Sequence, residues 1–426
     1  MKNKRKMPLA VLALILCGCA LFAMTGCSSA AAEGADSGVF SSSAQTGQTS
    51  LSAGSAILNG EELFTSRDLE QTPDLSEAAV ITLSDGQEVD ISEEGVYLLQ
   101  GTAKNTVVIV EADENAKVQL VLDGVSMENE NFPCIYVRSA DKVFVTTVSD
   151  SSLSVTASFV SDGTTGTDGV IFSKDDLVLS GSGRLTIHSS HNGVVCKDDL
   201  KITGGSYDIT ASAKCLEAKD SVRIADGSFT LNAGSDGIHA ENDEDDSLGY
   251  VYIGGGSFTI DAGDDGIHAN AFVQIDGGSF QISAAEGIEG TTIQINDGTI
   301  SIQSWDDGIN AAHKSSSYGV MVEINGGEIS ISMGAGDTDG IDSNGSIVIN
   351  GGTVSITGNS SFDYDGNAQL NGGTVIVNGQ ELDYIPNQMM GGFGGMGGGP
   401  GGFGGMGGGP GGNPGGGFGG GPGGRH

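Results

Sequence analysis

The chain has 426 residues, and its 55 acidic against 18 basic side chains give a formal net charge of −37. This excess leaves no basic surface to neutralise a phosphate backbone, which argues against nucleic acid as a partner. The acids concentrate in the second half: between Ala225 and Asn387 there are 25 acids and one basic residue, Lys314. So many carboxylates repel one another unless cations bind or water solvates them.

The N-terminus has the pattern of a bacterial export signal. Basic residues within the first six positions precede an apolar run that ends at Met24 and is too short to span a membrane comfortably. The next residues, Thr25-Gly26-Cys27, resemble a lipobox, although Met24 stands where Leu is usual. We expect 1–26 to be removed and Cys27 to be lipidated, which would anchor the protein on the extracellular face of the cell membrane. A cleaved signal without lipid is the alternative.

Two segments outside the central region lack the apolar side chains that a core requires. Residues 27–56 are rich in Ser, Ala, Gly and Thr, which predicts a flexible tether. Residues 388–426 repeat Gly, Met, Phe and Pro, which predicts a disordered tail. The region between, 57–387, contains no linker and is expected to form one domain. Its three cysteines fit neither a disulfide framework nor a zinc site, so we expect them in the core.

The region 57–387 repeats one phrase: a short strand, Asn/Asp-Gly-Gly, a second strand, and an acidic pair before Gly-Ile. The phrase is clearest in 252–268 and 275–289, and the turn glycines recur about every 22 residues with occasional insertions. Side chains alternate along each strand, as in Phe280-Gln281-Ile282, and no helical segment connects the strands. The pattern predicts an all-β fold, a parallel β-helix solenoid with about 22 residues per coil.

Stacked coils place equivalent residues above one another, so the positions before and after Gly-Ile form two columns rich in carboxylates. Bare carboxylates one coil apart would repel, and calcium relieves this because it takes about six to eight oxygen ligands. The alternative is a solvated acidic face with Asp present for its turn propensity, which does not account for the acidic pairs. We predict several calcium sites with ligands among Asp236, Asp264, Asp265, Glu286, Glu289, Asp306, Asp307, Asp337, Asp339 and Asp342.

A further column carries basic residues. Lys174, Lys197 and Lys219 recur one coil apart and would form a row of ammonium groups able to bind an anionic sugar polymer. The alternative is pairing with the adjacent Asp residues at the surface, which contributes little energy. Lys214 replaces an acid where the basic coils give way to acidic ones, and we expect bound sugar near this boundary.

Three rings are also candidates for ligand contact. His239 and His268 align in adjacent coils. They could bind a transition metal with neighbouring acids, but oxygen-rich surroundings favour calcium, and a hydrogen-bonded histidine ladder is the simpler interpretation. Trp305 directly precedes Asp306-Asp307 and could either stack on a sugar ring or fill space in the core or in a turn.

As a set, these motifs resemble those of the clostridial family of cellulose- and pectin-binding β-helix lipoproteins, the carbohydrate-binding domain-containing proteins. The lipobox, Gly101-Thr102, the coil 120–125 and the Asp-Gly-Ile-His-Ala turns carry this resemblance, which covers roughly 57–385. It implies a right-handed parallel β-helix like that of pectate lyases, bound calcium, and binding of plant-type polysaccharide, either cellulose or acidic pectic chains. The coils of Asn192 and Lys214 depart from the Asp-Gly-Ile pattern, which weakens the case for calcium there.

We therefore predict a monomeric, non-catalytic, calcium-binding cell-surface protein that captures polysaccharide. One alternative is a calcium-dependent pectate-type lyase, in which the metal acidifies the uronate α-proton and a lysine removes it. Lys214 and Lys314 are the candidate bases, and the scarcity of basic residues near the acidic columns argues against lysis. A second alternative is a surface adhesin or structural protein whose ligand is not a sugar.

Overall fold

The computed structural model describes residues 56–334 and 338–388. Within these ranges the chain forms 34 strands and one short 3-10 helix, η1 (Gly60–Glu62), which confirms the predicted all-β solenoid. No helix in the described ranges is long and apolar enough to cross a membrane. The predicted signal peptide, Cys27, almost all of the tether, Asp337 and the glycine-rich tail from 389 onward lie outside the described residues.

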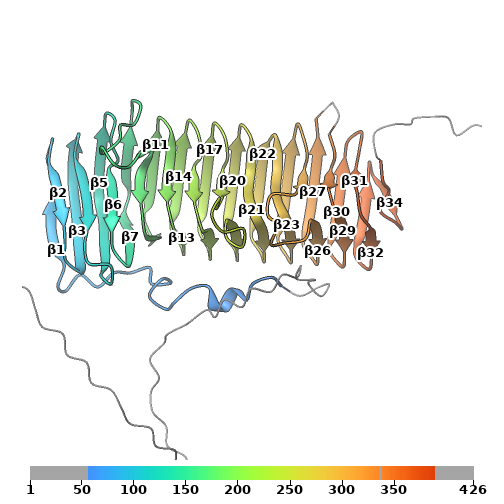
Figure 1. Cartoon of the computed structure of the whole chain (residues 1–426), viewed down its shortest axis with the longest axis horizontal. Helices are drawn as coiled ribbons and strands as arrows, with labels where there is room; N and C mark the ends of the chain where they lie inside the picture. The colour runs from blue at the N-terminus through green and yellow to red at the C-terminus, as the bar shows by residue number, and fades with distance from the viewer. Residues whose placement is uncertain (1–55, 335–337, 389–426) are drawn as a thin grey trace, which may run out of the picture. The chain divides into compact units, whose positions relative to one another are not determined.

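The strands form three stacks, and each coil contributes a strand to every stack (Figure 1). All strand pairs are parallel except the last. Stack 1 consists of β1 (Ala79–Thr82), β3 (Gly95–Lys104), β5 (Lys117–Asn129), β7 (Lys142–Ser149), β10 (Asp176–Gly181), β13 (Asp199–Ile202), β16 (Ser221–Ile224), β19 (Tyr250–Ile253), β21 (Asp265–Ile275), β23 (Glu286–Ile295), β26 (Met321–Ile324), β29 (Ser346–Ile349) and β32 (Ala368–Leu370).

Stacks 2 and 3 complete each coil, and the long strands β3, β5, β21 and β23 run through two stacks. Stack 2 continues from β3 and β5 into β8 (Ser151–Val155), β11 (Arg184–Ser189), β14 (Ser206–Ala211), β17 (Ser228–Ala233), β20 (Ser257–Ala262), β22 (Ser279–Ala284), β24 (Thr299–Ser304), β27 (Glu328–Met333), β30 (Thr353–Thr357), β33 (Thr374–Val377) and β34 (Gln380–Leu382). Stack 3 includes the first halves of β21 and β23 together with β2 (Glu88–Ile91), β4 (Val107–Glu111), β6 (Ile135–Ser139), β9 (Gly169–Ser173), β12 (Asn192–Cys196), β15 (Leu216–Ala218), β18 (Ile238–Ala240), β25 (Ile309–Ala311), β28 (Ile341–Ser343) and β31 (Phe362–Tyr364).

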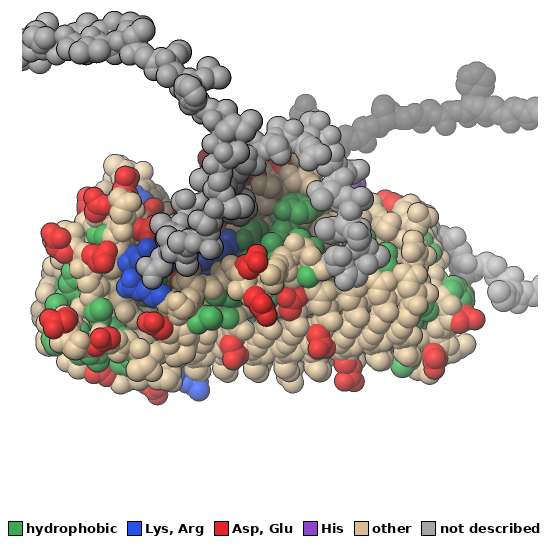
Figure 2. Space-filling model, turned by 90° about the horizontal axis from the view of Figure 1, so that it is seen from below, with side chains coloured by type: hydrophobic (Ala, Val, Ile, Leu, Met, Phe, Trp, Pro, Cys, Tyr) green, Lys and Arg blue, Asp and Glu red, His purple; other side chains and the backbone are tan. Residues whose placement is uncertain are grey.

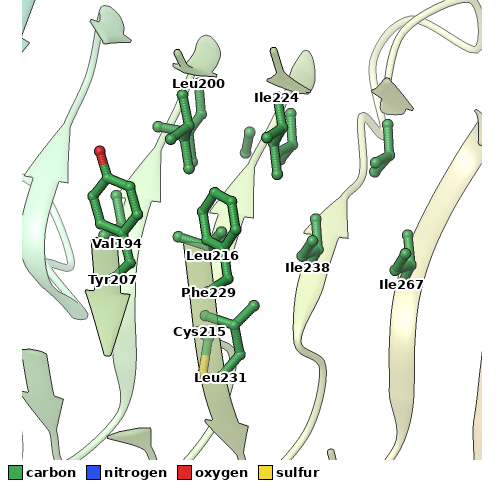
Figure 3. Packing of buried hydrophobic residues seen from close by; sticks show 14 of the residues in the cluster. Val194, Leu200, Tyr207, Cys215, Leu216, Ile224, Phe229, Leu231, Ile238 and Ile267 are labelled. Atoms are coloured by element: carbon green, nitrogen blue, oxygen red, sulfur yellow. The ribbon is translucent and has the colours of Figure 1, made fainter. Parts of the chain in front are cut away.

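The core consists of columns of apolar side chains inside the coils. Val194, Leu216, Ile238 and Ile267 follow one another in register, one per coil, and all are fully buried (Figure 3). Every second residue of a strand faces inward, so each coil extends each column by one side chain. The three cysteines of the described residues, Cys134, Cys196 and Cys215, are free and lie buried in the core, as predicted.

The turn between stacks 1 and 2 is built from the repeated Asn/Asp-Gly-Gly. Gly256 has a φ of 112°, a conformation that glycine adopts without a side-chain clash. In the later coils the asparagines themselves form a ladder: each Nδ2 of Asn325, Asn350 and Asn371 donates to the Oδ1 of the asparagine one coil earlier at 2.8 Å. The turn sequence therefore redirects the chain from stack 1 to stack 2, and its asparagines join adjacent coils by hydrogen bonds.

A segment before the first coil lies along the outside of stack 1. This segment, residues 57–72, is called the strap below (Figure 1). Leu58 exchanges two hydrogen bonds with Gln274, at 2.7 and 3.1 Å, and Gln71 accepts from the Gly181 amide at 2.9 Å. Along the strap, the chain therefore passes from the level of a later coil to the level of an earlier one, opposite to the order of the coils in the sequence. The coils begin at Ala79 rather than at 57, because the strap follows no repeat and pairs through side chains instead of a strand ladder.

Candidate functional site

The outer face of stack 3 carries a column of polar side chains. The register places Glu217, His239, His268, Glu289 and then Asn310 directly above one another, followed by Asp342. The two imidazole rings are stacked with centroids 4.5 Å apart and planes 16° from parallel. The geometry of the predicted column is therefore present, because the coil-to-coil register holds without slippage at these positions.

A cavity of about 700 Å³ opens beside this column, at the level where Lys214 interrupts the acidic pattern. It collects side chains from the loops and strands of five successive coils. Nine of the residues singled out in the sequence line it, and they comprise two lysines, two histidines and five acids: Lys214, Lys314, His239, His268, Asp236, Asp264, Asp265, Glu286 and Glu289.

His268 is held between two carboxylates on the wall of this cavity. Its Nδ1 lies 2.7 Å from Asp265 Oδ2 and 2.8 Å from Glu289 Oε2. Burial alone would lower the pKa of His268, but hydrogen bonds to Asp265 and Glu289 outweigh burial and raise the pKa to about 9. The other oxygen of Glu289 accepts from Lys314 Nζ at 2.7 Å. Burial raises the pKa of Glu289, but the hydrogen bonds and charges of His268 and Lys314 outweigh burial and lower this pKa to about 2.

In two neighbouring acids, Glu286 and Asp265, burial and the charge of Glu289 outweigh the hydrogen bonds that each carboxyl group makes. Burial, followed by the charge of Glu289, raises the pKa of Glu286 to about 8, although Asn310 Nδ2 donates to Glu286 at 3.0 Å. Burial together with Glu289 also raises the pKa of Asp265 to about 6 despite its contact with His268. At neutral pH the cavity therefore presents a protonated carboxyl group, an imidazolium and ionised carboxylates side by side.

His239 is paired in the same way one coil earlier. Its Nδ1 lies 2.8 Å from Asp236 Oδ2, and its Nε2 lies 3.2 Å from Glu241 Oε2. Burial raises the pKa of Asp236, but the contacts with His239 more than offset this and lower it to about 2. Hydrogen bonding to His239 likewise lowers the pKa of Glu241 to about 2. Glu241 was not among the residues predicted from sequence, because it lies one position beyond the repeated His-Ala pair.

The later coils are rich in acids and poor in basic residues. After Lys314 the sequence has no Lys, Arg or His until Arg425. Burial, then the charge of Asp342, raises the pKa of Asp307 to about 7, and burial, then Asp363, raises the pKa of Asp342 to about 6. Among the described residues, the side-chain oxygens of Asn310 and Thr338 are buried with no hydrogen-bond partner. Oxygen donors of both charged and neutral types thus gather at this end of the column, with Asp306 and Asp339 close to Asp307.

The predicted lysine row is present in register, but two of its ammonium groups are neutralised. Lys197 Nζ lies 3.2 Å from Glu217 Oε1, and Lys219 forms an ion pair with Glu244. Lys174 Nζ lies 5.6 Å from the ring centroid of Tyr136, within the range of a cation–π contact. Figure 2 shows Lys and Arg side chains in the N-terminal half of the face it presents and none over the later coils. The pairing alternative predicted for this row applies, with glutamates instead of the adjacent aspartates.

Trp305 lies at a corner between stacks 2 and 3, in the turn that follows β24. Its side chain is half exposed, at 50%, so it is not a core residue. Its backbone amide donates to Ala284 of the preceding coil at 3.4 Å, which fixes the turn while leaving the indole accessible.

Most of the solenoid matches a known protein family. A family model described as carbohydrate-binding domain-containing protein matches residues 85–340 and 292–383. A carbohydrate-binding domain-containing protein of Acetivibrio thermocellus is 32% identical over 130 residues, which cover 29% of this chain and 46% of that protein. The chain therefore spans less than half the length of this curated relative.

A solved structure of a polysaccharide lyase-like protein from C. thermocellum, a gadolinium derivative, is similar at a TM-score of 0.41 and 23% identity. The match covers 71% of this chain and 94% of that one. The family model accounts for most of the coils, from the second strand of the solenoid to its C-terminal end. The chain belongs to the family of carbohydrate-binding domain-containing proteins.

Proposed function

We propose that this protein is a non-catalytic receptor that captures plant-type polysaccharide on the bacterial cell surface. The cavity beside stack 3 is the observation that carries the proposal. Sugar hydroxyl groups both donate and accept hydrogen bonds, so a sugar site needs both kinds of partner. Lys214 and protonated Glu286 supply donors, whereas Asp264 and the buried, unpaired Oδ1 of Asn270 supply acceptors.

The charge of the cavity bears on which polymer enters it. Carboxylates outnumber the cationic groups in the lining, so an acidic pectic chain would be repelled unless a divalent cation bridges the two. A neutral chain such as cellulose meets no such barrier. We therefore propose binding of cellulose without metal, and binding of polygalacturonate that depends on calcium.

The protonation state of Lys314, one of the two candidate bases, argues against a role as a lyase. Burial lowers the pKa of Lys314, but its contact with Glu289 raises it above 10.5 overall, so Lys314 carries its proton at neutral pH and cannot accept another. Lys214 remains as a candidate base. Because the family description names binding, we propose that the cavity holds the chain without cleaving it.

The first prediction is that replacing Lys214 by alanine weakens polysaccharide binding about tenfold or more, since a hydrogen bond from a charged group contributes about 1.5–3 kcal/mol. The measurement is a pull-down with insoluble cellulose and an affinity titration with polygalacturonate, each with calcium and with chelator. Lys117→Ala, an exposed lysine paired with Asp141 in an early coil, is the control and should bind normally.

Three outcomes would contradict the proposal. Formation of unsaturated products from polygalacturonate, abolished by Lys214→Ala, would establish a lyase. Equal binding by native protein and Lys214→Ala would move the site away from the cavity. Failure to bind any polysaccharide would favour an adhesin with a different ligand.

We also propose that calcium binds the later part of the acidic column, to Asp306, Asp307, Asp339 and Asp342. The donor set fits this ion: it has four carboxylates, and burial and then neighbouring acids raise the pKa of two of them, Asp307 and Asp342. The buried side-chain oxygens of Asn310 and Thr338, which have no hydrogen-bond partner, lie nearby. Of the other predicted ligands, Asp236, Asp265 and Glu289 already contact histidine or lysine side chains. Bound calcium would supply positive charge that joins adjacent coils and can attract an acidic sugar chain.

The second prediction concerns this calcium. Adding calcium at about 100 times its Kd should stabilise the fold by about 2.7 kcal/mol, measured as a rise in melting temperature over chelator-treated protein. Asp307→Asn together with Asp342→Asn should remove this rise. Asp261→Asn, an exposed acid on stack 2 in the same acidic half, should retain it. A calcium-dependent shift that survives the double substitution would locate the ion elsewhere.

Attachment to the cell surface is proposed from the lipobox-like sequence ending at Cys27, outside the described residues. The third prediction is that a labelled fatty acid is incorporated into the native chain and that Cys27→Ser abolishes this incorporation. Equal labelling of both forms would exclude Cys27 as the anchor, and absence of label from the native chain would favour an ordinary cleaved signal.

A further inference from the structure

A compact group of nitrogen and oxygen ligands lies on the cavity wall, apart from the proposed calcium ligands. Asp265, His268 and Glu289, from β21 and β23, each offer one ligand atom, and these atoms all lie within 4.8 Å of one another. His268 Nδ1 is the central atom, 2.7 Å from Asp265 Oδ2 and 2.8 Å from Glu289 Oε2. Two adjacent coils therefore direct two carboxylates at one imidazole nitrogen.

This arrangement is incomplete as a hydrogen-bonded group. An imidazole nitrogen carries at most one proton, and that proton points along one line, so it serves one carboxylate fully and leaves the other poorly satisfied. In a tetrahedral zinc site the nitrogen and oxygen ligands lie about 2.0–2.2 Å from the ion, which places neighbouring ligand atoms about 3.3–3.6 Å apart. The two observed separations, 2.7 and 2.8 Å, are shorter, so the two carboxylates must move outward to admit an ion.

Neighbouring side chains orient the proposed ligands, as the residues around a metal site commonly do. Lys314 Nζ binds Glu289 Oε1 at 2.7 Å, which orients the carboxylate and leaves Oε2 for a metal. The ring of His239 stacks on His268 and fixes its plane. His239 itself is 5% exposed, and its Nδ1 makes no well-aligned hydrogen bond although Asp236 is 2.8 Å away. A second buried imidazole nitrogen beside the same cavity is thus not fully satisfied.

We propose that Asp265 Oδ2, His268 Nδ1 and Glu289 Oε2 bind a divalent first-row transition ion, with Zn²⁺ as the ion to test first. The ion takes the place of the Nδ1 proton of His268, which is released to solvent. An imidazole nitrogen with two carboxylates suits such ions, whereas calcium prefers oxygen ligands alone. The cavity leaves the remaining coordination positions open to water or to a further ligand. This site goes beyond the proposed function, since it requires neither polysaccharide nor calcium.

The test is isothermal titration of the full chain with ZnCl₂ after dialysis against chelator. We expect one Zn²⁺ per chain at this site, and His268→Gln or Glu289→Gln should weaken binding more than 100-fold. Lys314→Met, which removes a partner that orients a ligand, should weaken it about 10- to 100-fold. His188→Gln, an exposed histidine on β11, should leave it unchanged. Co²⁺ bound to the native chain should show absorption bands of an imidazole-ligated ion.

Two results would overturn the site. The first is that both His268→Gln and Glu289→Gln bind Zn²⁺ with an affinity within about threefold of the native value. The second is that millimolar Ca²⁺ displaces Zn²⁺ completely, which would assign the cluster to the calcium column. Circular dichroism checks that the variants remain folded. Should both unfold, the Co²⁺ spectrum of the native chain decides, because a spectrum like that of the hydrated ion would also overturn the site.

Discussion

Replacing Phe258 by alanine is expected to lower the free energy of unfolding by about 3–5 kcal/mol, as is usual when a large buried aromatic is truncated. Phe258 is 1% exposed and lies between Phe229 and Phe280, with ring centroids 4.6 and 4.5 Å away and planes within 2° of parallel. The cavity left behind cannot close easily, because the strands above and below hold their spacing through backbone hydrogen bonds. Urea unfolding followed by far-ultraviolet circular dichroism measures the change.

The same substitution should act locally, because a coil of a solenoid contacts only its neighbours. Hydrogen exchange is expected to accelerate in β17, β20 and β22 more than in β30 and β33. Thr259→Ala, at the exposed position next to Phe258, is the control and should change stability little. Uniform acceleration along the whole chain would mean that the coils unfold as one cooperative unit.

The repeat explains why the fold could be predicted. A regular spacing near 22 residues fixes which residues stack, so the sequence predicted that His239 and His268 align in adjacent coils, and the observed register confirms it. This prediction rests on register alone, and register is strongly specified when a one-residue slip would expose a buried face.

The partners of the predicted side chains could not be obtained in this way. Lys314, which binds Glu289, and Glu244, which binds Lys219, both come from insertions that break the repeat. The path of an insertion depends on packing that no periodicity records. For this reason the sequence could predict several calcium sites along the acidic columns, but not that Asp265 and Glu289 contact His268 or that Glu289 also contacts Lys314.

The strap was missed for a related reason. Its contacts join residues far apart in the sequence, such as Gln71 with Gly181 and Thr203, and it has no alternating pattern of its own. Its key residue is Asp68, fully buried between Lys142 Nζ at 3.3 Å and Lys201 Nζ at 3.5 Å. These lysines are 11% and 9% exposed, so the strap supplies the charge that allows both to be buried in stack 1.

Replacing Asp68 by asparagine is therefore expected to destabilise the protein by about 3–5 kcal/mol, because two buried ammonium groups lose their main counter-charge. Lys142 retains Asp176 at 3.5 Å, but Lys201 has no other ion pair among the described residues. Lys117→Met, which breaks an exposed pair with Asp141, should have little measurable effect. Thermal unfolding at pH 7 compares the three proteins, and an unchanged melting temperature for Asp68→Asn would contradict the role given to the strap.

The effect should also depend on pH in a defined direction. Burial raises the pKa of Asp68, but the amide of Thr65 and the charges of Lys201 and Lys142 outweigh burial and lower the pKa below 3.8. A carboxyl group whose pKa is lower in the folded state stabilises the fold above its unfolded pKa, and this contribution disappears as the pH falls through the folded pKa. The stability difference between native protein and Asp68→Asn should thus be full near pH 7 and shrink below pH 3.8. A difference that stays constant down to low pH would mean that Asp68 acts by packing and not by its charge.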